Sequence, residues 1–393
     1  MDFRFSKDDE NFRQEVRDFI RKEVPSDWAE RGDTESTDDL WEFHRSFQKR
    51  LATKGWLVAF WPKQYGGQEW PYYRQLILNE ELSYNRLPKP DRVAIAMAGP
   101  NIIAHGTEEQ KKRHLPPIAN AELVWCQLFS EPNAGSDLAA IQTTATENGD
   151  EFIINGQKTW TTLGHRAQWG IMLARTNPNV PKHKGISYFL MDMGLPGVRL
   201  RPIIDMAGRH HVNEVFFDNV RVPKDCLLGE KNMGWYLGAN TLNMERSAIS
   251  DAASSRRMLQ ELMDYARTGK WGGRRAVEVN PAMRHKMAEL EIEVEMARLL
   301  SYRVSWMQTA KRPFSHEAAI AKMFSFELSQ RLAQTAMQLT GLYGQVGKGE
   351  WAHVRGKPQR IYLVTVASTI GGGTSEIQRT TIAQRGLGLP RGA

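Results

Sequence analysis

Two short segments of the chain combine small residues, hydroxyl groups and an aromatic ring in a way that suits a planar, phosphate-bearing ligand. The first segment covers residues 128–137 and reads LFSEPNAGSD. Its small residues at 134–136 let a backbone approach a ligand closely and offer donors to an anion such as a pyrophosphate. In the second segment, Trp160 could cover one face of an aromatic cofactor while the hydroxyl of Thr162 bonds its edge. Each signal alone also fits an ordinary turn or a core tryptophan, so the two segments suggest cofactor binding without deciding it.

The composition indicates a globular enzyme with more than one domain. A chain of 393 residues exceeds what one compact core usually contains. Its balance of 41% apolar and 25% charged residues is not that of a disordered or fibrous chain. No window reaches the roughly 18 apolar residues of a membrane span, and residues 1–9 lack the apolar run of a secretory signal. We therefore expect a cytoplasmic protein with no membrane partner.

Disulfide, metal and nucleic-acid roles find no support in the sequence. Cys126 and Cys226 have no CxxC partner, and we interpret both as core thiols. His210 and His211 have no carboxylate or thiol at a ligand spacing, which favours a polar loop. The formal charge of +7 is modest, and basic residues do not alternate with aromatic residues along one element. We expect no metal and no nucleic-acid partner.

The first part of the chain is expected to be helical. Ser6 and Asp9 form a capping-box pattern ahead of an amphipathic run that ends at Pro25. Helical patterning continues with breaks to about residue 120 and includes residues 40–51 and 108–114. This pattern predicts an α-helical domain.

The middle of the chain is expected to form a small β domain. Asn148-Gly149 and Asn155-Gly156 are type I′ hairpin signals, so three strands should run as a meander around the two turns. Short runs rich in β-branched and aromatic residues predict further strands in a small sandwich or barrel. These further runs cover residues 169–175, 185–193 and 213–222.

The last part of the chain returns to a helical period. Two long stretches without Gly or Pro, residues 283–311 and 315–340, have the length of bundle helices. Ser315 is the expected N-cap of the second stretch, and Gly341 is its expected C′ residue. The predicted fold class is a multi-domain α+β protein with three domains, at residues 1–122, 123–228 and 229–393.

Three motifs together resemble the acyl-CoA dehydrogenase family. They are SEPNAGSD at 130–137, NGQKTW at 155–160 with the two threonines that follow, and GGGTSEIQR at 371–379. Their order and separations match the family over essentially the whole chain. The resemblance implies an N-terminal helical domain, a central antiparallel β domain and a C-terminal four-helix bundle. It also implies that FAD is bound between domains and that the chain usually assembles as a tetramer.

The resemblance implies a first set of FAD contacts. Phe129 and Ser130 should contact the isoalloxazine, and Trp160 and Thr162 should meet its ring face and its N5 edge. Ser136 should contact the cofactor's phosphates or the CoA arm of the substrate. For the first two residues, a packing role in a strand stays open.

A second set of contacts is expected from a neighbouring subunit. In the family, a Gln-x-x-Gly-Gly-x-Gly segment of that subunit holds the adenosine half of FAD. Gln338, Gly341 and Gly344 occupy three of these positions, and Leu342 replaces the second Gly.

Residues near the C-terminus complete the expected cofactor site. Thr374 and Glu376 match the family's ribityl and adenosine contacts. An Arg that reaches the diphosphate of the partner's FAD is harder to place, because the local spacing is not kept. Arg267 and Arg274 are both open for that role.

Desaturation of a thioester requires a carboxylate. It removes a proton from Cα and a hydride from Cβ, and the hydride goes to flavin N5, so the carboxylate must lie against Cα opposite the flavin. At the family's usual position for this Glu, the chain has Gly372. A minority of the family, including the isovaleryl and long-chain enzymes, places the base on a bundle helix directly before an Arg, as in Glu245-Arg246. We therefore predict Glu245 as the base, with Asn243 and Arg246 as CoA contacts.

The two carboxylates of these motifs carry different expectations. A bound acyl chain that expels water would raise the pKa of Glu245 toward neutrality and make it a stronger proton acceptor. The alternative is that Glu245 pairs with a basic side chain on a helix surface. Glu376 is not predicted as the base, because it lies four residues beyond Gly372 and matches a cofactor-facing position.

The glycines at 371–373 predict added volume at the acyl end of the substrate site, including at Gly372. We expect a bulky, branched or polycyclic acyl group, as in bacterial family members that act on sterol-derived acyl-CoAs. The segment from Gln345 to Tyr362, which carries Trp351, could line the mouth of that site. An ordinary surface insertion is the alternative for this segment.

Three functional classes stay open from the sequence. The first is an acyl-CoA dehydrogenase of lipid degradation with an electron-transfer flavoprotein as its acceptor. The second is a flavin monooxygenase or oxidase on the same fold, which needs no α-proton base and would suit the missing Glu at Gly372. The third is one chain of a heterotetramer with a related chain, in which this chain, with Glu245, would be the catalytic one.

Overall fold

The computed structural model describes residues 5–28, 30, 39–88, 90–244, 248–271 and 274–390. Contacts divide the chain into two compact units. The helical unit comprises residues 1–47, 70–89 and 246–393, and the sheet unit comprises residues 48–69 and 90–245. These two units combine separated segments of the chain, whereas the predicted domains at 1–122, 123–228 and 229–393 are continuous. The three-domain division stays a prediction.

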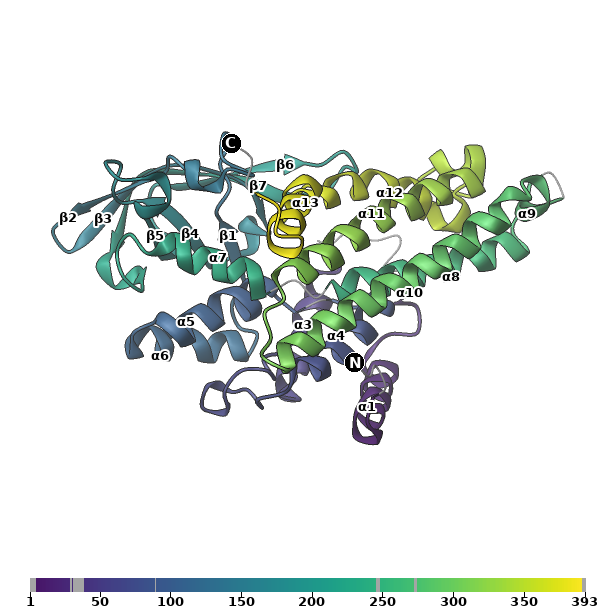
Figure 1. Cartoon of the computed structure of the whole chain (residues 1–393), viewed down its shortest axis with the longest axis horizontal. Coiled ribbons are helices and arrows are strands. Elements are labelled where there is room, and N and C mark those ends of the chain that lie inside the picture. The colour runs from purple at the N-terminus through teal and green to yellow at the C-terminus, as the bar shows by residue number, and fades with distance from the viewer. Residues whose placement is uncertain are drawn as a thin grey trace. The chain divides into compact units, whose positions relative to one another are not determined.

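The sheet unit is built on one eight-stranded sheet (Figure 1). The strand order is β6-β7-β3-β2-β4-β5-β8, and β1 pairs with β4. Most pairings are antiparallel, while β1 and β2 each run parallel to β4. The central antiparallel β domain is therefore confirmed. The strands are β1 (Trp125–Leu128), β2 (Thr144–Asn148), β3 (Glu151–Thr162), β4 (Trp169–Arg175), β5 (Ile186–Asp192), β6 (Val198–Ile204), β7 (His210–Pro223) and β8 (Leu227–Leu228).

The sheet curls so that β3 and β5, which are not neighbours in the strand order, pack against each other. Phe152 of β3 meets Phe189 of β5 edge to face, with ring centroids 5.1 Å apart. Because β2 and β4 separate these strands in the sheet order, the contact requires the sheet to fold over. The space between the two faces is filled by fully buried side chains that include Leu128, Ile154 and Val215. This arrangement agrees with the expected small sandwich or barrel.

One of the two predicted hairpin turns is present and the other is wrong. Asn148 pairs with Glu151 across a turn at Gly149, as the sequence predicts. At Asn155-Gly156, however, β3 continues without a turn, and its pairing with β7 only shifts register. A Cβ atom on Gly156 would lie 2.5 Å from the hydroxyl of Thr143, so glycine is needed there for close packing.

The sequence pattern does not predict strands β1 and β6, and it places a histidine pair in a loop where the structure has a strand. β1 has only four residues, and β6 is largely exposed, so neither shows the expected alternation. His210 and His211 begin β7 and are not in a loop. The Nε2 atom of His210 lies 2.8 Å from Oδ1 of Asn213, and the His210 ring stacks on His165. Among the described residues, no group of three or more His, Cys, Asp or Glu is placed to hold a metal ion.

Helices and short turns complete the sheet unit. Thr107 and Gln110 form a capping box at the start of α6, which runs beyond the predicted segment to Ala119. The side-chain amide of Gln110 donates to the carbonyl oxygens of Asp225 and Leu227, and it anchors α6 near β8. The remaining elements are η1 (Lys63–Tyr65), the π-helix η2 (Val93–Ala98), α5 (Gly99–His105), α6 (Glu108–Ala119), η3 (Leu138–Ala140), η4 (Gly164–Arg166), η5 (Lys182–Lys184), η6 (Lys224–Cys226) and α7 (Gly234–Met244).

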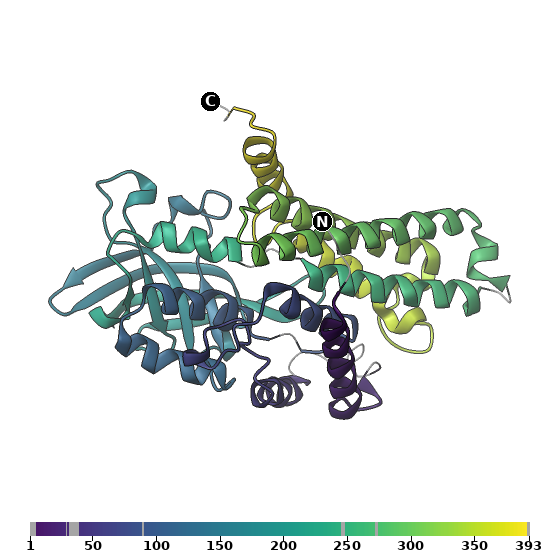
Figure 2. The same cartoon turned by 60° about the horizontal axis from the view of Figure 1, so that its bottom comes forward.

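The helical unit contains the expected C-terminal bundle, in which α8, α10 and α11 pack on one another and α4 packs on α8 and α10 (Figure 2). Helices α12 and α13 lie along α11. The unit comprises α1 (Lys7–Glu23), α4 (Tyr72–Tyr84), α8 (Ile249–Thr268), α9 (Ala276–Val279), α10 (Ala282–Thr309), α11 (Ser315–Thr340), η7 (Gly341–Gln345), η8 (His353–Gly356), α12 (Lys357–Thr365), η9 (Val366–Thr369), α13 (Ser375–Thr381) and the π-helix η10 (Ile382–Gly386), with a two-stranded hairpin of β9 (Lys270–Trp271) and β10 (Arg274–Arg275). Helix α3 (Trp41–Thr53) crosses the boundary between the units.

Helix ends follow the sequence in two cases out of three. Ser6 and Asp9 form the expected capping box at the start of α1. Gly341 ends α11 with a φ of 57°, as a terminating glycine should. Ser315 is not an N-cap, because α11 already begins at this residue without a side-chain cap. The hydroxyl of Ser315 instead accepts a hydrogen bond from Arg385.

Both cysteines of the chain are buried, as the sequence analysis expects. Burial raises the pKa of the Cys226 thiol to about 12. Burial likewise raises the pKa of Cys126. None of the described helices has the length and apolar character needed to cross a membrane.

We expect Gly99→Ala to destabilise the sheet unit by about 3 kcal/mol or more, because overpacking at a site that cannot yield exceeds the usual cost. A Cβ atom at Gly99 would lie 1.9 Å from the buried ring of Trp61, whose indole N–H is held by the carbonyl of Ile95. Urea unfolding would measure the loss. Gly194→Ala, in an exposed turn of the same unit, is the control and should change the free energy of unfolding by less than about 0.5 kcal/mol. Equal midpoints for the two variants would contradict this account of Trp61.

Candidate active site

Strand β3 turns Trp160 outward near the end of the strand. Trp160 has a φ of 59°, and its side chain is 63% exposed. The pairing of β3 with β7 is interrupted here, between Lys158 and Thr161. A positive φ is a genuine outlier for a bulky residue and persists only where the surroundings enforce it. The bulge therefore presents a large aromatic face to the outside, and Thr162, two residues on, is also exposed.

The end of β1 lies directly beside this bulge. The backbone N–H of Thr159 donates to the carbonyl of Ser130 at 2.9 Å. Glu131 and Ala134 then exchange two backbone hydrogen bonds and close a tight turn, beyond which Ser136 is exposed. Ser130 and Trp160 are thus brought together, with the exposed turn following directly.

Phe129 has the packing role that the sequence leaves open for it. Its side chain is only 4% exposed and packs edge to face against Tyr188. Its carbonyl oxygen accepts a hydrogen bond from the side chain of Lys158. The ring of Phe129 belongs to the core of the sheet unit, and its contact with the isoalloxazine stays a prediction.

Gly135 stands in open space. A Cβ atom at this position would have no neighbour within 4 Å, and the φ of Gly135 is not in the left-handed region. Neither packing nor backbone conformation therefore requires a glycine here. The open backbone is compatible with close approach of a ligand, which stays a prediction from the sequence for residues 134–136.

In the helical unit, a buried lysine fixes the turn formed by Gly371, Gly372 and Gly373, which we call the glycine turn. Lys322 of α11 is 7% exposed, and its ammonium group donates to the carbonyl oxygens of Gly371, at 2.9 Å, and Gly373. Gly372 lies between these two anchor points with a φ of 66°, and a Cβ atom on it would have no neighbour within 4 Å. At the family's usual position for the base, the chain therefore has a turn that Lys322 holds in place, with open space above it.

Helix α13 begins directly after the glycine turn. The hydroxyl of Thr374 accepts the backbone N–H of Ile377 and caps the helix. The pKa of Glu376 is lowered, first by its own backbone N–H and then by the hydroxyl of Thr374. A carboxylate with a lowered pKa is a weak proton acceptor, which agrees with leaving Glu376 out as the base.

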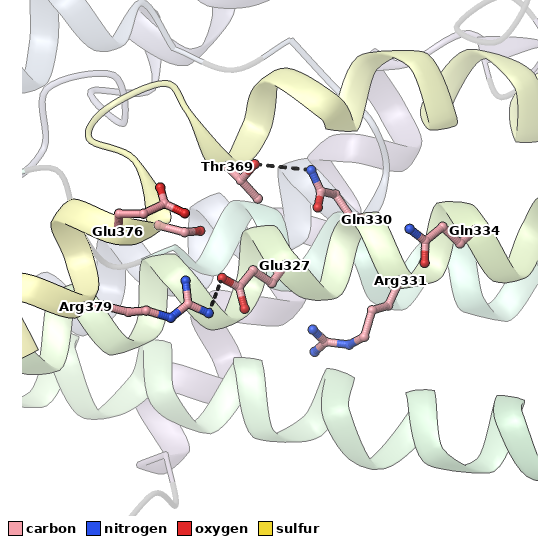
Figure 3. Close-up of a pocket in the computed structure, with 8 residues that line it drawn as sticks. Glu327, Gln330, Arg331, Gln334, Thr369, Glu376 and Arg379 are labelled. Carbon is pink, nitrogen blue, oxygen red and sulfur yellow. Dashed lines mark hydrogen bonds and ion pairs between the residues drawn. The ribbon is translucent and has the colours of Figure 1, made fainter. Parts of the chain in front are cut away.

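A polar hollow of about 330 Å³ lies between α11 and the α13 segment (Figure 3). Gln330 donates to the hydroxyl of Thr369, and Arg379 pairs with Glu327 at 2.9 Å. The hollow is lined by residues that repeat every three or four positions along α11, together with residues of the opposing segment. They are Glu327, Gln330, Arg331, Gln334, Thr369, Ser375, Glu376 and Arg379.

The expected contacts to a neighbouring subunit continue the same polar face of α11. Gln338 is exposed and lies one turn beyond Gln334. Gly341 ends the helix, and Gly344 is buried against Thr340. Leu342 is 82% exposed.

The chain matches the models of one protein family along most of its length. The Acyl-CoA dehydrogenase N-terminal domain matches residues 6–122, the middle domain residues 126–220 and the C-terminal domain residues 232–387. Acyl-CoA dehydrogenase IpdE1 of Mycobacterium tuberculosis is 35% identical over 396 residues, which cover 98% of this chain and 99% of that protein. The chain belongs to the acyl-CoA dehydrogenase family. It is an oxidoreductase of a family that depends on FAD.

Other acyl-CoA dehydrogenases show the same similarity. The chain is 36% identical to FadE34 of M. tuberculosis over 88% of its own length, but it spans only 46% of the length of FadE34. The Tcur3481-Tcur3483 steroid ACAD matches with a TM-score of 0.89 at 31% identity, with 100% of both chains covered. The ChsE4-ChsE5 complex from M. tuberculosis matches with a TM-score of 0.88 at 32% identity, also with 100% of both chains covered.

The expected acyl-CoA dehydrogenase base lies outside the part of the chain that the structure describes. Glu245 and Arg246 both fall in the gap after α7, while Asn243 lies in the last turn of that helix. Their roles therefore stay predictions. Of the two arginines open for the diphosphate role, Arg267 ends α8 and pairs with Asp264, and Arg274 lies in β10.

Trp351 and the glycine turn lie at different parts of α11, and a role of Trp351 at the acyl mouth stays a prediction. Its ring stacks on Tyr343, which stacks in turn on His353, just beyond the C-terminal end of α11. The glycine turn is bound instead by Lys322, near the N-terminal end of the same helix. With a rise of 1.5 Å per residue, about 27 Å of helix separates Lys322 from Thr340, the last residue of α11.

Three buried charged side chains near these acyl-CoA dehydrogenase motifs have no role predicted from the sequence. Lys158 and Glu131 stand inside two of the motifs, and Lys322 bonds the third. A lysine inside a strand motif is a signal that could have drawn attention, because a buried lysine needs a partner. For Lys322, a lysine on a bundle helix, the sequence offers no such signal.

The residues at hand fit FAD in both units. In the sheet unit, Trp160 offers an exposed aromatic face, Thr162 an exposed hydroxyl, and Gly135 an unobstructed backbone. In the helical unit, Glu376 lines a hollow with amide and guanidinium donors, and Thr374 caps the helix that carries Glu376. These groups could hold the ring, the hydroxyls and the phosphates of the cofactor.

We expect Gly135→Ala to leave folding intact and to weaken ligand binding. The free energy of unfolding should change by less than about 1 kcal/mol, because the new methyl group meets no atom. The dissociation constant of FAD or the KM for an acyl-CoA should rise by about tenfold, equivalent to 1.4 kcal/mol. Fluorescence titration and steady-state kinetics would measure these constants. If Gly135→Ala bound both ligands as the wild type does, the interpretation of this turn would fail.

Proposed function

We propose that this chain desaturates an acyl-CoA thioester between Cα and Cβ, with Glu245 as the base. The observation that carries the proposal is the glycine turn. At the position of the family's usual Glu, Gly372 has no side chain to accept a proton, and Lys322 fixes the turn in that form. Glu376, four residues on, is a weak acceptor because of its lowered pKa. The carboxylate directly before Arg246 is the family's alternative base, which favours Glu245.

The reaction needs one proton acceptor from the chain and one hydride acceptor from the cofactor. FAD, when bound, supplies the hydride acceptor at its N5 atom. The carboxylate of Glu245 takes the proton from Cα as the Cα–H bond breaks, and the hydride leaves Cβ as the new double bond forms. Exclusion of water by the acyl group raises the pKa of Glu245 and so suits it for this transfer.

We infer the cofactor contacts from the exposed groups of each unit. Trp160 covers a face of the isoalloxazine, the hydroxyl of Thr162 bonds its N5 edge, and Ser130 contacts it beside the bulge. Ser136 binds phosphate oxygens of FAD or of CoA. The exposure of Trp160 and Thr162 and the open turn around Gly135 support these roles.

Contacts from the helical unit extend the proposed cofactor site. Thr374 and Glu376 bind the ribityl and adenosine parts of FAD, while Gln338, Gly341 and Gly344 serve the FAD of a neighbouring subunit. Thr374 and Glu376 lie at the glycine turn and the polar hollow, which supports their assignment. Asn243 and Arg246 are assigned to CoA by the position of their motif alone.

Replacement of Glu245 by Gln tests the base directly. We expect anaerobic reduction of the flavin by an acyl-CoA to slow by about two to four orders of magnitude, because the variant cannot accept the α-proton. FAD should stay bound, since Gln keeps the size and polarity of Glu. Stopped-flow absorbance of the flavin would measure the rate.

Glu376→Gln is the comparison variant for this experiment. A loss of reduction in Glu376→Gln with a fast Glu245→Gln enzyme would move the base to Glu376 and overturn the assignment. Flavin that no acyl-CoA bleaches, combined with oxygen uptake driven by NADH or a reductase partner, would instead indicate a monooxygenase or oxidase on this fold.

We propose that the acyl group is bulky, branched or polycyclic. The open space above Gly372 and the anchoring of both flanking carbonyls by Lys322 support this substrate class. A similar solved structure is a steroid ACAD by its own description. The proposal places this chain in the degradation of steroid-like or branched lipid side chains.

We expect Gly372→Ala to reduce activity selectively. The methyl group projects into the space reserved for the acyl group, so kcat/KM should fall about tenfold for a sterol-derived thioester, or 1.4 kcal/mol, and much less for a short linear one. Steady-state kinetics with both thioesters would measure the ratio. Gly388→Ala is the matched control, because Gly388 has the same φ of 66° and the same open surroundings away from the glycine turn. A preference of the wild type for short linear chains would argue against the proposed substrate.

We infer that reduced flavin passes its electrons to an electron-transfer flavoprotein and that the chain works as a homotetramer or as the base-bearing chain of a heterotetramer. A similar solved structure is a complex of two proteins, ChsE4 and ChsE5. The exposed Leu342, next to residues expected to serve a neighbour's FAD, supports an assembly of subunits. The cytoplasmic location stays a prediction that cell fractionation would check.

A further inference from the structure

Lys158 is completely buried in the sheet unit, beside the proposed flavin site. Its side chain is 0% exposed, yet it lies two residues before the exposed Trp160. The ammonium group donates to the carboxylate of Glu131 at 2.7 Å and to the carbonyl of Phe129 at 3.1 Å. Burial lowers the pKa of Lys158 to about 8, although Glu131 opposes this shift, so the group is charged at neutral pH. A fully buried lysine is rare, and nothing in the desaturation chemistry uses this one.

Glu131 connects Lys158 to a third segment of the chain. One carboxylate oxygen accepts from Lys158 and from the backbone N–H of Thr143, at 2.9 Å. The other oxygen accepts from the backbone N–H of Gln142, at 2.6 Å. Burial alone would raise the pKa of Glu131, but Lys158 and these donors outweigh burial and lower it. The ion pair therefore connects three segments: β3, the turn after β1 and the residues just before β2.

The residues held by this ion pair are those expected to face the flavin. Lys158 fixes the carbonyl of Phe129, and the next residue, Thr159, bonds the carbonyl of Ser130. Directly after these bonds the backbone takes the strained conformation that exposes Trp160. A strained residue keeps its conformation only while the surrounding bonds enforce it.

We propose that Lys158 and Glu131 form a buried clamp that sets the positions of Ser130 and Trp160 relative to the flavin. Lys158 is then a positioning residue of the site. The inference rests on the proposed function, because it assumes that the flavin lies against Trp160. It adds that the geometry of the flavin site depends on the buried charge of Lys158, which does not itself contact the flavin.

A second buried ion pair provides a matched control. Lys357, 1% exposed, donates to Glu261 at 2.7 Å within the helical unit. Glu261 also pairs with Arg86 and Arg257. Lys357 belongs to the segment 345–362 that could line the acyl mouth, but its side chain is buried against Glu261, and none of these side chains is assigned a contact with the cofactor or the substrate. Removing either lysine leaves a buried carboxylate with fewer partners, so both substitutions should lower stability. Only the loss of Lys158 should change the flavin site.

Lys158→Met in the FAD-loaded enzyme tests the clamp. We expect the dissociation constant of FAD to rise at least tenfold and the visible circular dichroism of the bound flavin to change, since Ser130 and Trp160 no longer hold their positions. Turnover at saturating FAD should show a lower kcat with little change in the KM for acyl-CoA. Lys357→Met should lower the urea midpoint of unfolding but leave FAD affinity and the flavin spectrum unchanged.

A measurement on the apo-protein keeps the test independent of the cofactor. The near-ultraviolet circular dichroism of each protein minus that of its Trp160→Phe counterpart isolates the Trp160 signal, which should differ between wild type and Lys158→Met. Lys158→Gln, which keeps one donor, is the milder variant if Lys158→Met does not fold, and it should shift FAD affinity in the same direction. An unchanged flavin spectrum and FAD affinity in Lys158→Met or Lys158→Gln, or an equal effect of Lys357→Met, would overturn the clamp. Wild-type protein that binds no FAD would overturn the proposed function itself.

Discussion

An ammonium group without any solvent contact is stable only while other groups of the protein replace the water it has lost. In the sheet unit, the carboxylate of Glu131 and the carbonyl of Phe129 do this for Lys158. Each of these acceptors lies on a different part of the loop after β1, so the charge can be solvated only when the loop takes one particular path. The position of Ser130 and the exposure of Trp160 are consequences of that path.

The helical unit also contains a buried lysine that holds a loop in place. Lys322 also finds its acceptors in a loop, but they are backbone carbonyls on both sides of a glycine. The turn is thereby rigid without any side chain filling the space above it. Glu376 lies a few residues away, and the start of its own helix stabilises the ionised form of its carboxylate.

The sequence predicts those features that depend on neighbours along the chain. The capping box at Ser6, the turn at Gly149 and the glycine that ends α11 all follow from local backbone needs. The continuation of β3 through Gly156 could not be predicted, because the decisive contact is with Thr143, thirteen residues away. Ser315 likewise has a partner, Arg385, that only the folded chain brings near.

The same limit applies to the candidate site. The motifs predict Trp160, Thr162 and Ser136 as ligand contacts, and the structure exposes all three. The burial of Phe129 and of Lys158 does not follow from the motifs. A simple alternation of inward and outward residues fails along β3, because the register shift after Lys158 makes two successive residues, Lys158 and Thr159, buried ones. The family resemblance shows which segments carry the motifs. Only the three-dimensional contacts show which buried side chains hold these segments in position.

The two deeply buried thiols have a practical consequence. Cys126 and Cys226 are the only cysteines of the chain, and with raised pKa values inside the fold they form very little reactive thiolate. A single cysteine engineered at an exposed position would therefore react with a maleimide or a spin label almost alone. The native sequence is already a background for site-specific labelling.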